Sequence, residues 1–161
     1  MTVNLPPNIA HEMIVTRSFA CPRERLFSMW TEPVHLARWW APHGFSTPNP
    51  VLDPFVGGRV ELDLRAPDGM LLRSSGTIEE IVPPELLAFT LAVLEFDGRQ
   101  RLCVMNTVTF AEQGPGTTEM VLHVEVVEAT PAAAFNLKNM PRSWSETLEK
   151  LEQHLRAVTD R

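Results

Sequence analysis

Residues 137–158 read LKNMPRSWSETLEKLEQHLRAV, and the fold of this chain can be worked out from this stretch. Its large apolar side chains recur at steps of three and four, which places them on one stripe of an α-helix. The stripe consists of Leu137, Met140, Trp144, Leu148, Leu151, Leu155 and Val158. The other face is charged and offers two i,i+4 pairs, Glu146 with Lys150 and Glu152 with Arg156. The pattern predicts a long amphipathic helix.

The apolar stripe of this helix needs a large partner surface. Burying one large apolar side chain contributes roughly 1.5–3 kcal/mol, so the stripe contributes on the order of 10 kcal/mol before the entropy cost of folding. Most of the preceding chain has the period-two pattern of strands, so the predicted partner is a sheet. Pro141 is expected to kink the helix or to split it, with Ser143-x-x-Glu146 as a capping box for the second segment.

Length and composition restrict the class of protein. With 161 residues, 44% hydrophobic and 21% charged, we expect a flexible N-terminal arm over residues 1–11 and a single globular domain over residues 12–158. The net charge of −6 argues against a nucleic-acid partner. The chain has no apolar run of membrane-spanning length and no signal-peptide pattern, so we expect no membrane insertion and a cytoplasmic location. Cys21 and Cys103 are interpreted as free thiols.

Turn signals divide the rest of the chain into short elements. A strand is expected over residues 12–19, followed by two short helices, one beginning at Pro22 and one spanning residues 33–40. Further strands are expected over residues 60–64, 71–82, 86–96, 102–112 and 117–127. The short connections between these strands predict an antiparallel meander. Thr130 is expected to cap the last helix, with Pro131 at its first position.

Several motifs occur in a fixed order along the chain. Trp30-Thr31-Glu32-Pro33 and Leu36-Ala37-Arg38-Trp39-Trp40-Ala41-Pro42 form a W-T-x-P…L-x-x-W-W-x-P pattern. Asp53-Pro54-Phe55-Val56-Gly57-Gly58-Arg59 follows, and Ser143-Trp144-Ser145-Glu146-Thr147-Leu148 lies in the last helix. Over residues 14–155 this series resembles the heat-shock chaperone ATPase activator homologue family, part of the START-like, birch-pollen-allergen-like superfamily (SRPBCC). Pro141, and Ser143 in place of a common Gly, depart from the family pattern.

The resemblance implies an α+β helix-grip fold. In this fold a curved antiparallel sheet of about six to seven strands wraps around the long C-terminal helix, two short helices follow the first strand, and a cavity lies between sheet and helix. It implies much less about chemistry, because one fold hosts many functions.

Candidate binding residues come from three parts of the chain. An aromatic wall suits a hydrophobic pocket, although ordinary core packing is the alternative for each Trp. Small residues in the middle of the sheet leave either space or close contact with the helix. Asn106 has the parity of the apolar residues in its strand, so it is expected to point inward, where backbone and water or a ligand must satisfy its amide. The predicted ligand-binding set is Trp30, Trp39, Trp40, Phe45, Phe55, Ser74, Thr90, Asn106, Met140 and Trp144.

The sequence offers no catalytic set. The five histidines share no metal-ligand spacing on one element, so no metal site is predicted. Gly57-Gly58 lies between strands rather than before a helix, which does not fit a phosphate loop, and no cofactor is predicted. No nucleophile, base and orienting group are visible together, and the chain is interpreted as more a binding protein than an enzyme.

Three functions remain open. The first is a START-like protein that binds a hydrophobic small molecule in the internal cavity. The second is an enzyme similar to polyketide cyclases and dehydratases that uses the same cavity. The third is a regulator of a chaperone ATPase, suggested only by the family name. A homodimer is possible in any of these.

Overall fold

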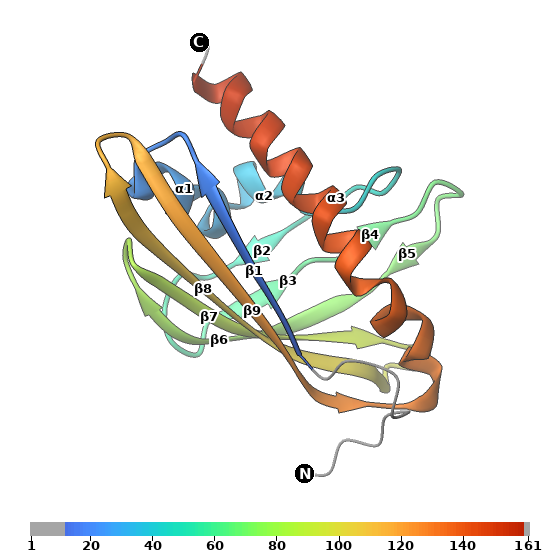
Figure 1. Ribbon diagram of the computed structural model, residues 1–161. Helices are drawn as coiled ribbons and strands as arrows, with labels where there is room; N and C mark the ends of the chain where they lie inside the picture. Colours follow the sequence, from blue (N-terminus) through green and yellow to red (C-terminus); the bar gives the residue numbers. More distant parts are fainter. Residues whose placement is uncertain (1–11, 160–161) are drawn as a thin grey trace.

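Strand-forming residues dominate the chain up to residue 129, and they build one large antiparallel sheet. The structure, a computed structural model, describes residues 12–159, so the arm expected over residues 1–11 lies outside the described part. The main sheet has the strand order β1-β9-β8-β7-β6-β3-β2 (Figure 1). Its strands are β1 (Glu12–Phe19), β2 (Val51–Leu52), β3 (Arg59–Glu61), β6 (Ser74–Val82), β7 (Leu86–Leu94), β8 (Gln100–Gly114) and β9 (Thr117–Ala129). A separate hairpin pairs β4 (Leu64–Arg65) with β5 (Leu71–Leu72).

The expected meander is confirmed, but two of the predicted strands are divided. The strand predicted over residues 60–64 is divided between β3 of the main sheet and β4 of the separate hairpin. The strand predicted over residues 71–82 is divided at Arg73 into β5 and β6, which belong to different sheets. The backbone explains the division, because the carbonyl of Arg73 accepts a hydrogen bond from the N–H of Leu94 in β7, while Leu72 pairs with Leu64 in β4.

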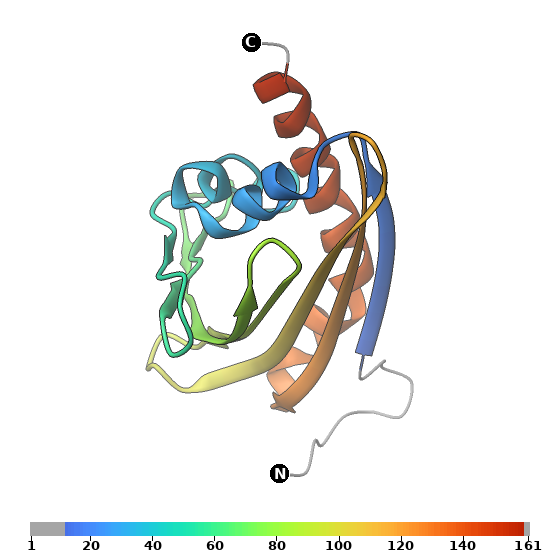
Figure 2. The same cartoon turned by 90° about the vertical axis from the view of Figure 1, so that its left-hand side faces the viewer.

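The sheet is strongly curved, and one of its faces carries the core. Side chains alternate between the two faces of a strand, so Leu87 and Phe89 of β7 share a face, as do Val108 and Phe110 of β8. All four are buried. We call this the inner face and the opposite one the outer face. The helix α3 (Ala134–Thr159) runs across the open side of the curved sheet, and α1 (Arg23–Thr31) and α2 (Pro33–Trp39) lie at one end (Figures 1 and 2).

Pro33 separates the two short helices and leaves one carbonyl of α1 without its usual helical donor. In a continuous helix the carbonyl of Met29 would accept the N–H of residue 33, but Pro33 has none. The indole Nε1–H of Trp39 supplies the missing donor at 2.9 Å. The Trp39 side chain therefore joins α2 to α1.

The C-terminal helix is continuous. A 3₁₀ turn, η1 (Pro131–Ala133), leads into α3, and α3 passes through Pro141 without a break in helical structure, so the split alternative is wrong. The hydroxyl of Ser143 does not cap a second helical segment. The backbone carbonyl of Ser143 accepts a hydrogen bond from Thr147 Oγ1 at 2.7 Å. Thr130 was expected to cap this helix, but its hydroxyl donates to the carbonyl of Arg101.

The apolar stripe of α3 faces the inner face of the sheet, as predicted. Leu148 and Leu151 are fully buried in the main hydrophobic core together with inner-face residues of β7, β8 and β9. A second, smaller cluster lies where α3 begins. It consists of Leu102, Ala129, Ala133 and Leu137. Within residues 12–159, no helix has the length and apolar content needed to cross a bilayer.

Candidate functional site

The four tryptophans gather where α1, α2 and α3 meet the inner face. The Trp30 ring stacks on that of Trp144 with centroids 6.0 Å apart, and it meets Trp39 edge to face at 4.8 Å. Trp40 contacts Trp144 at 5.1 Å and Phe89 of β7 at 6.1 Å. The cluster therefore links the short helices, α3 and the sheet through ring contacts.

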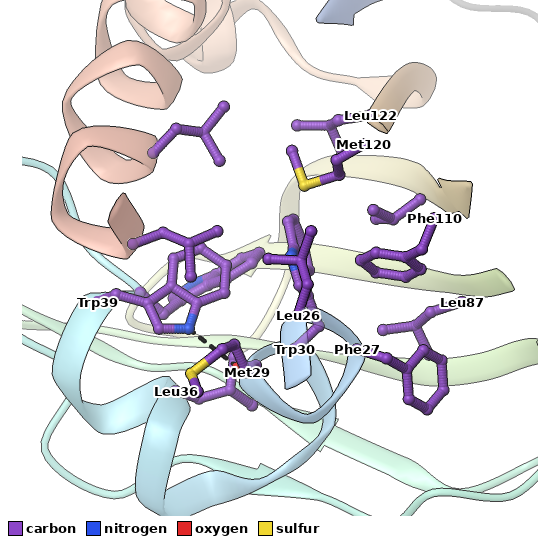
Figure 3. Close-up of a cluster of buried hydrophobic side chains, with 14 of the residues drawn as sticks. Leu26, Phe27, Met29, Trp30, Leu36, Trp39, Leu87, Phe110, Met120 and Leu122 are labelled. Carbon is purple, nitrogen blue, oxygen red and sulfur yellow. Dashed lines mark hydrogen bonds between the residues drawn. The ribbon is translucent and has the colours of Figure 1, made fainter. Parts of the chain in front are cut away.

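Burial separates these four side chains. Trp30 is 1% exposed, Trp39 0% and Trp40 7%, so these three form part of the packed core. Trp144 is half-buried. The indole N–H of Trp39 bonds to Met29, whereas the buried Nε1 of Trp30 has no partner among the described residues (Figure 3).

Apolar side chains on the inner face are not uniformly buried. Val104 of β8 and Met140 of α3 pack against both core clusters, yet both are half-buried. Val126 of β9 and Val93 of β7, which adjoin the smaller cluster, are half-buried as well. The two cores are thus separated by a band of apolar side chains that face inward and still reach solvent.

Asn106 points inward from β8, as its parity predicts. It is 1% exposed, and its cross-strand partners are Phe89 and Val124, which are equally buried. Its Nδ2 donates a long hydrogen bond of 3.5 Å to the carbonyl of Phe89. Its Oδ1 is buried and has no partner among the described residues.

The two small residues predicted for the site lie on different faces. Ser74 shares the inner face of β6 with Ile78 and is 6% exposed. Thr90 lies between the inward residues Phe89 and Leu91, so alternation places it on the outer face. Its hydroxyl bonds to the N–H and the carbonyl of Thr77 at 3.2 and 3.4 Å. The inward placement expected for Thr90 is therefore wrong.

The two predicted phenylalanines also differ from the expectation. Phe55 is 60% exposed in the loop between β2 and β3, away from the inner face. Phe45 is half-buried in the loop after α2, and its carbonyl accepts a hydrogen bond from Lys150 Nζ of α3 at 3.2 Å. Phe45 therefore lies beside α3, but Phe55 does not join the other predicted residues.

The polar face of α3 contacts α2 and the loop that follows it, and the sequence did not predict these contacts. His154 Nε2 and His35 Nδ1 of α2 lie 2.9 Å apart. Glu146 accepts the N–H of His43 at 3.1 Å, and Glu149 lies 3.4 Å from the His43 ring. The pair expected between Glu146 and Lys150 is replaced by these contacts, whereas Arg156 and Glu152 pair at 2.6 Å as predicted.

Ionisable groups with shifted pKa values lie outside this band. Burial raises the pKa of the Cys21 and Cys103 thiols above the ordinary value and lowers the pKa of the Lys150 ammonium. The raised thiol pKa values favour the protonated form, which is a poor nucleophile. These groups lie on separate elements and do not form a catalytic set.

Two other features lie away from the predicted site. A surface recess of about 330 Å³ occurs at the turn between β8 and β9, and it is lined by Pro22, Glu112, Gly114, Pro115, Gly116 and Thr117. None of the predicted binding residues lines it. On the outer face of β1 and β9, atoms of Glu12, His123 and Glu125 that could bind a metal ion lie within 4.8 Å of one another. His123 Nε2 lies 2.7 Å from Glu12 Oε2.

A curved antiparallel sheet that holds a long C-terminal helix on its inner face defines a helix-grip protein of the START-like type. The sequence profile of the family described as Activator of Hsp90 ATPase homolog 1-like protein matches residues 20–156. Because this match covers most of the chain, the protein belongs to that family. No curated protein matches the chain.

Solved structures share the fold. A protein from Arthrobacter aurescens has a TM-score of 0.80 at 19% identity, with 92% of this chain and 87% of that chain covered. The AHSA1 protein from Silicibacter pomeroyi has a TM-score of 0.78 at 21% identity, covering 91% and 99%. A protein from Chromobacterium violaceum has a TM-score of 0.73 at 23% identity, covering 89% and 95%. At these identities the likeness concerns the fold alone.

Proposed function

We propose that this protein binds an apolar small molecule between the inner face of the sheet and α3. The observation that carries the proposal is the band of inward-facing but half-buried apolar side chains between the two core clusters. Val104, Val126 and Met140 belong to this band. Inward apolar surface that still meets water gains free energy when a hydrocarbon covers it, at roughly 25 cal/mol per Å².

The aromatic cluster suits one boundary of such a site. Trp144 is half-buried and lies one helical turn after Met140, and its ring contacts those of Trp30 and Trp40. A rigid aromatic wall with few polar groups is typical of sites for hydrophobic ligands. The predicted residues that support this proposal are thus Trp144, Met140 and Asn106, with Trp40 and Ser74 at the periphery.

Thermal unfolding with naphthalene as the probe tests the proposal. A ligand at a hundred times its Kd adds about 2.7 kcal/mol to stability. For a domain of this size that corresponds to a rise in melting temperature of roughly 5–10 °C. We expect naphthalene to raise the melting temperature by several degrees.

A matched pair of variants locates the site. Val104→Phe fills the inward band, whereas Val121→Phe enlarges a residue that lies on the outer face beside the buried Leu122. The naphthalene-induced rise should disappear in the first variant and persist in the second. If Val104→Phe does not fold, Val126→Phe serves in its place. A melting temperature that naphthalene leaves unchanged in the natural protein would contradict the proposal.

The two alternative functions gain no support from a specific contact. Among the described residues, the inner-face neighbours of Asn106 are hydrocarbon side chains, and a cyclase-like reaction needs a group there that donates or accepts a proton. The family name concerns an activator of a chaperone ATPase. Within residues 12–159, no contact or surface feature of the structure favours a chaperone partner.

A further inference from the structure

Asn106 is an isolated polar group in the middle of an apolar surface. On either side across the sheet it meets Phe89 and Val124, which are each 1% exposed. Along β8 its inner-face neighbours are Val104 and Val108. All four neighbours are hydrocarbons, so none of them can donate a hydrogen bond to its side chain.

The orientation of the Asn106 amide is set by the backbone. Its Nδ2 faces the carbonyl of Phe89 at 3.5 Å. The reversed orientation would bring Oδ1 to that carbonyl and place two acceptors together, which is unfavourable. The Oδ1 atom therefore points away from Phe89, and it is buried without a partner among the described residues.

A buried amide oxygen without a donor is a costly arrangement. Native proteins satisfy nearly all such atoms, and each exception calls for a specific explanation. Replacing Asn106 with Leu would keep the branched shape of the side chain and remove the unsatisfied group, so packing alone does not require an amide here. The donor that the Oδ1 atom lacks can come from an enclosed water or from a molecule that occupies the adjoining half-buried band.

We propose that the ligand of this site is an apolar molecule with one neutral hydrogen-bond donor, a hydroxyl or an N–H, that binds Asn106 Oδ1. This inference rests on the proposed function and specifies its ligand class. A carbonyl, ether or carboxylate at the same position would place a second hydrogen-bond acceptor against Asn106 Oδ1. Such groups are therefore disfavoured at this end of the ligand.

The test compares 1-naphthol with naphthalene, two probes of the same ring system that differ by one hydroxyl. Titration calorimetry or fluorescence with the full chain gives both dissociation constants. The natural protein should bind 1-naphthol about tenfold or more tightly than naphthalene, because a hydrogen bond to a buried unsatisfied acceptor contributes that much. In Asn106→Leu the preference should vanish, while naphthalene binds at least as tightly as before.

Control variants and the two possible negative results separate the donor inference from the binding proposal. Asn106→Ala is measured beside Asn106→Leu, so the comparison does not depend on one variant folding. Thr107→Val, which alters the neighbouring polar residue on the outer face of β8, should keep the preference for 1-naphthol. If naphthalene binds and 1-naphthol binds no more tightly, the donor inference is wrong and the binding proposal stands. If neither probe binds, the binding proposal itself fails.

Discussion

Trp39 and Trp30 have nearly equal burial but different hydrogen bonding, and this pair isolates the effect of one bond. Trp39 donates to the carbonyl of Met29, which Pro33 leaves without a helical partner. Trp30 donates to no described atom. Trp39→Phe should therefore lower the free energy of unfolding by about 1–3 kcal/mol more than Trp30→Phe, because a buried carbonyl loses its donor.

Urea unfolding of both variants gives this difference directly. Each substitution removes the same volume, so the cavity terms largely cancel. Equal losses of stability would mean that the Met29 carbonyl finds water, and that the link between α1 and α2 is only a packing contact.

Gly76 shows how closely two strands approach at one point of the sheet. A Cβ built there would lie 1.8 Å from the carbonyl oxygen of Thr90. Gly76→Ala must therefore shift the backbone of β6 or β7, and we expect a loss of about 1–3 kcal/mol in urea unfolding. Gly114→Ala is the matched control, because a Cβ there meets nothing within 4 Å. It should change stability by less than about 0.5 kcal/mol, and a comparable loss in both would contradict this account.

The buried thiols predict a dependence of stability on pH. Burial raises the pKa of Cys21 above the ordinary value of 9.0, and burial with the charges of Glu128 and Glu79 does the same for Cys103. The unfolded chain therefore loses these protons first, so their contribution is complete below about pH 9 and declines as the pH rises through the folded values.

A double variant, Cys21→Ala with Cys103→Ala, removes this contribution. Its free energy of unfolding should fall less steeply than that of the natural protein between about pH 8 and about pH 10. Lys150 acts in the opposite sense, because burial lowers its pKa, but it is present in both proteins. Parallel slopes would show that the two thiols titrate alike in the folded and unfolded chains.

Some residue positions could be predicted from the sequence and others could not. Asn106 breaks a regular alternation of large apolar residues, so its inward direction followed from parity. β7 is apolar on both faces, with Leu87, Phe89 and Leu91 alternating with Ala88 and Ala92. Alternation alone therefore does not say which set faces the helix, and Thr90 was assigned to the wrong side. Phe55 lies in a recognised turn motif, but such a motif does not indicate whether the side chain is buried or exposed.

At the scale of the element, α3 was predictable on its apolar side and not on its polar side. The stripe depends on spacing within one segment, so its burial followed from the sequence. Glu146 and Lys150 have partners more than a hundred residues away, in the loop after α2. Local i,i+4 pairing was therefore the only signal available, and it gave the wrong partners.

Pro141 gives a prediction for the same helix. It sits inside continuous helix and is exposed, and it has no N–H to offer the carbonyl of Leu137. Pro141→Ala should raise the free energy of unfolding by about 1–3 kcal/mol, because proline in a helix interior costs about 3 kcal/mol relative to alanine. Urea unfolding measures the change. A loss of stability would show that the local backbone shape set by Pro141 is needed to seat Met140 and Trp144.

At the scale of the whole molecule, the order of elements determined the fold. Short connections require antiparallel neighbours, and a single amphipathic helix after the strands requires the sheet as its partner. The division of the interior into two cores with a half-buried band between them was not predictable, because it depends on how far α3 lies from the sheet. That distance is a property of the assembled structure and has no local signature.

The central claim is that an apolar molecule enters between the inner face and α3, and methyl NMR during titration with 1-naphthol tests it most directly. The account predicts large chemical-shift changes for the methyl groups of Val104, Val126 and Met140. Ile14, which is 62% exposed, and Val34, which is 66% exposed, should remain unchanged as reference methyl groups. Shifts confined to such exposed methyl groups, or no shifts at all, would contradict the account.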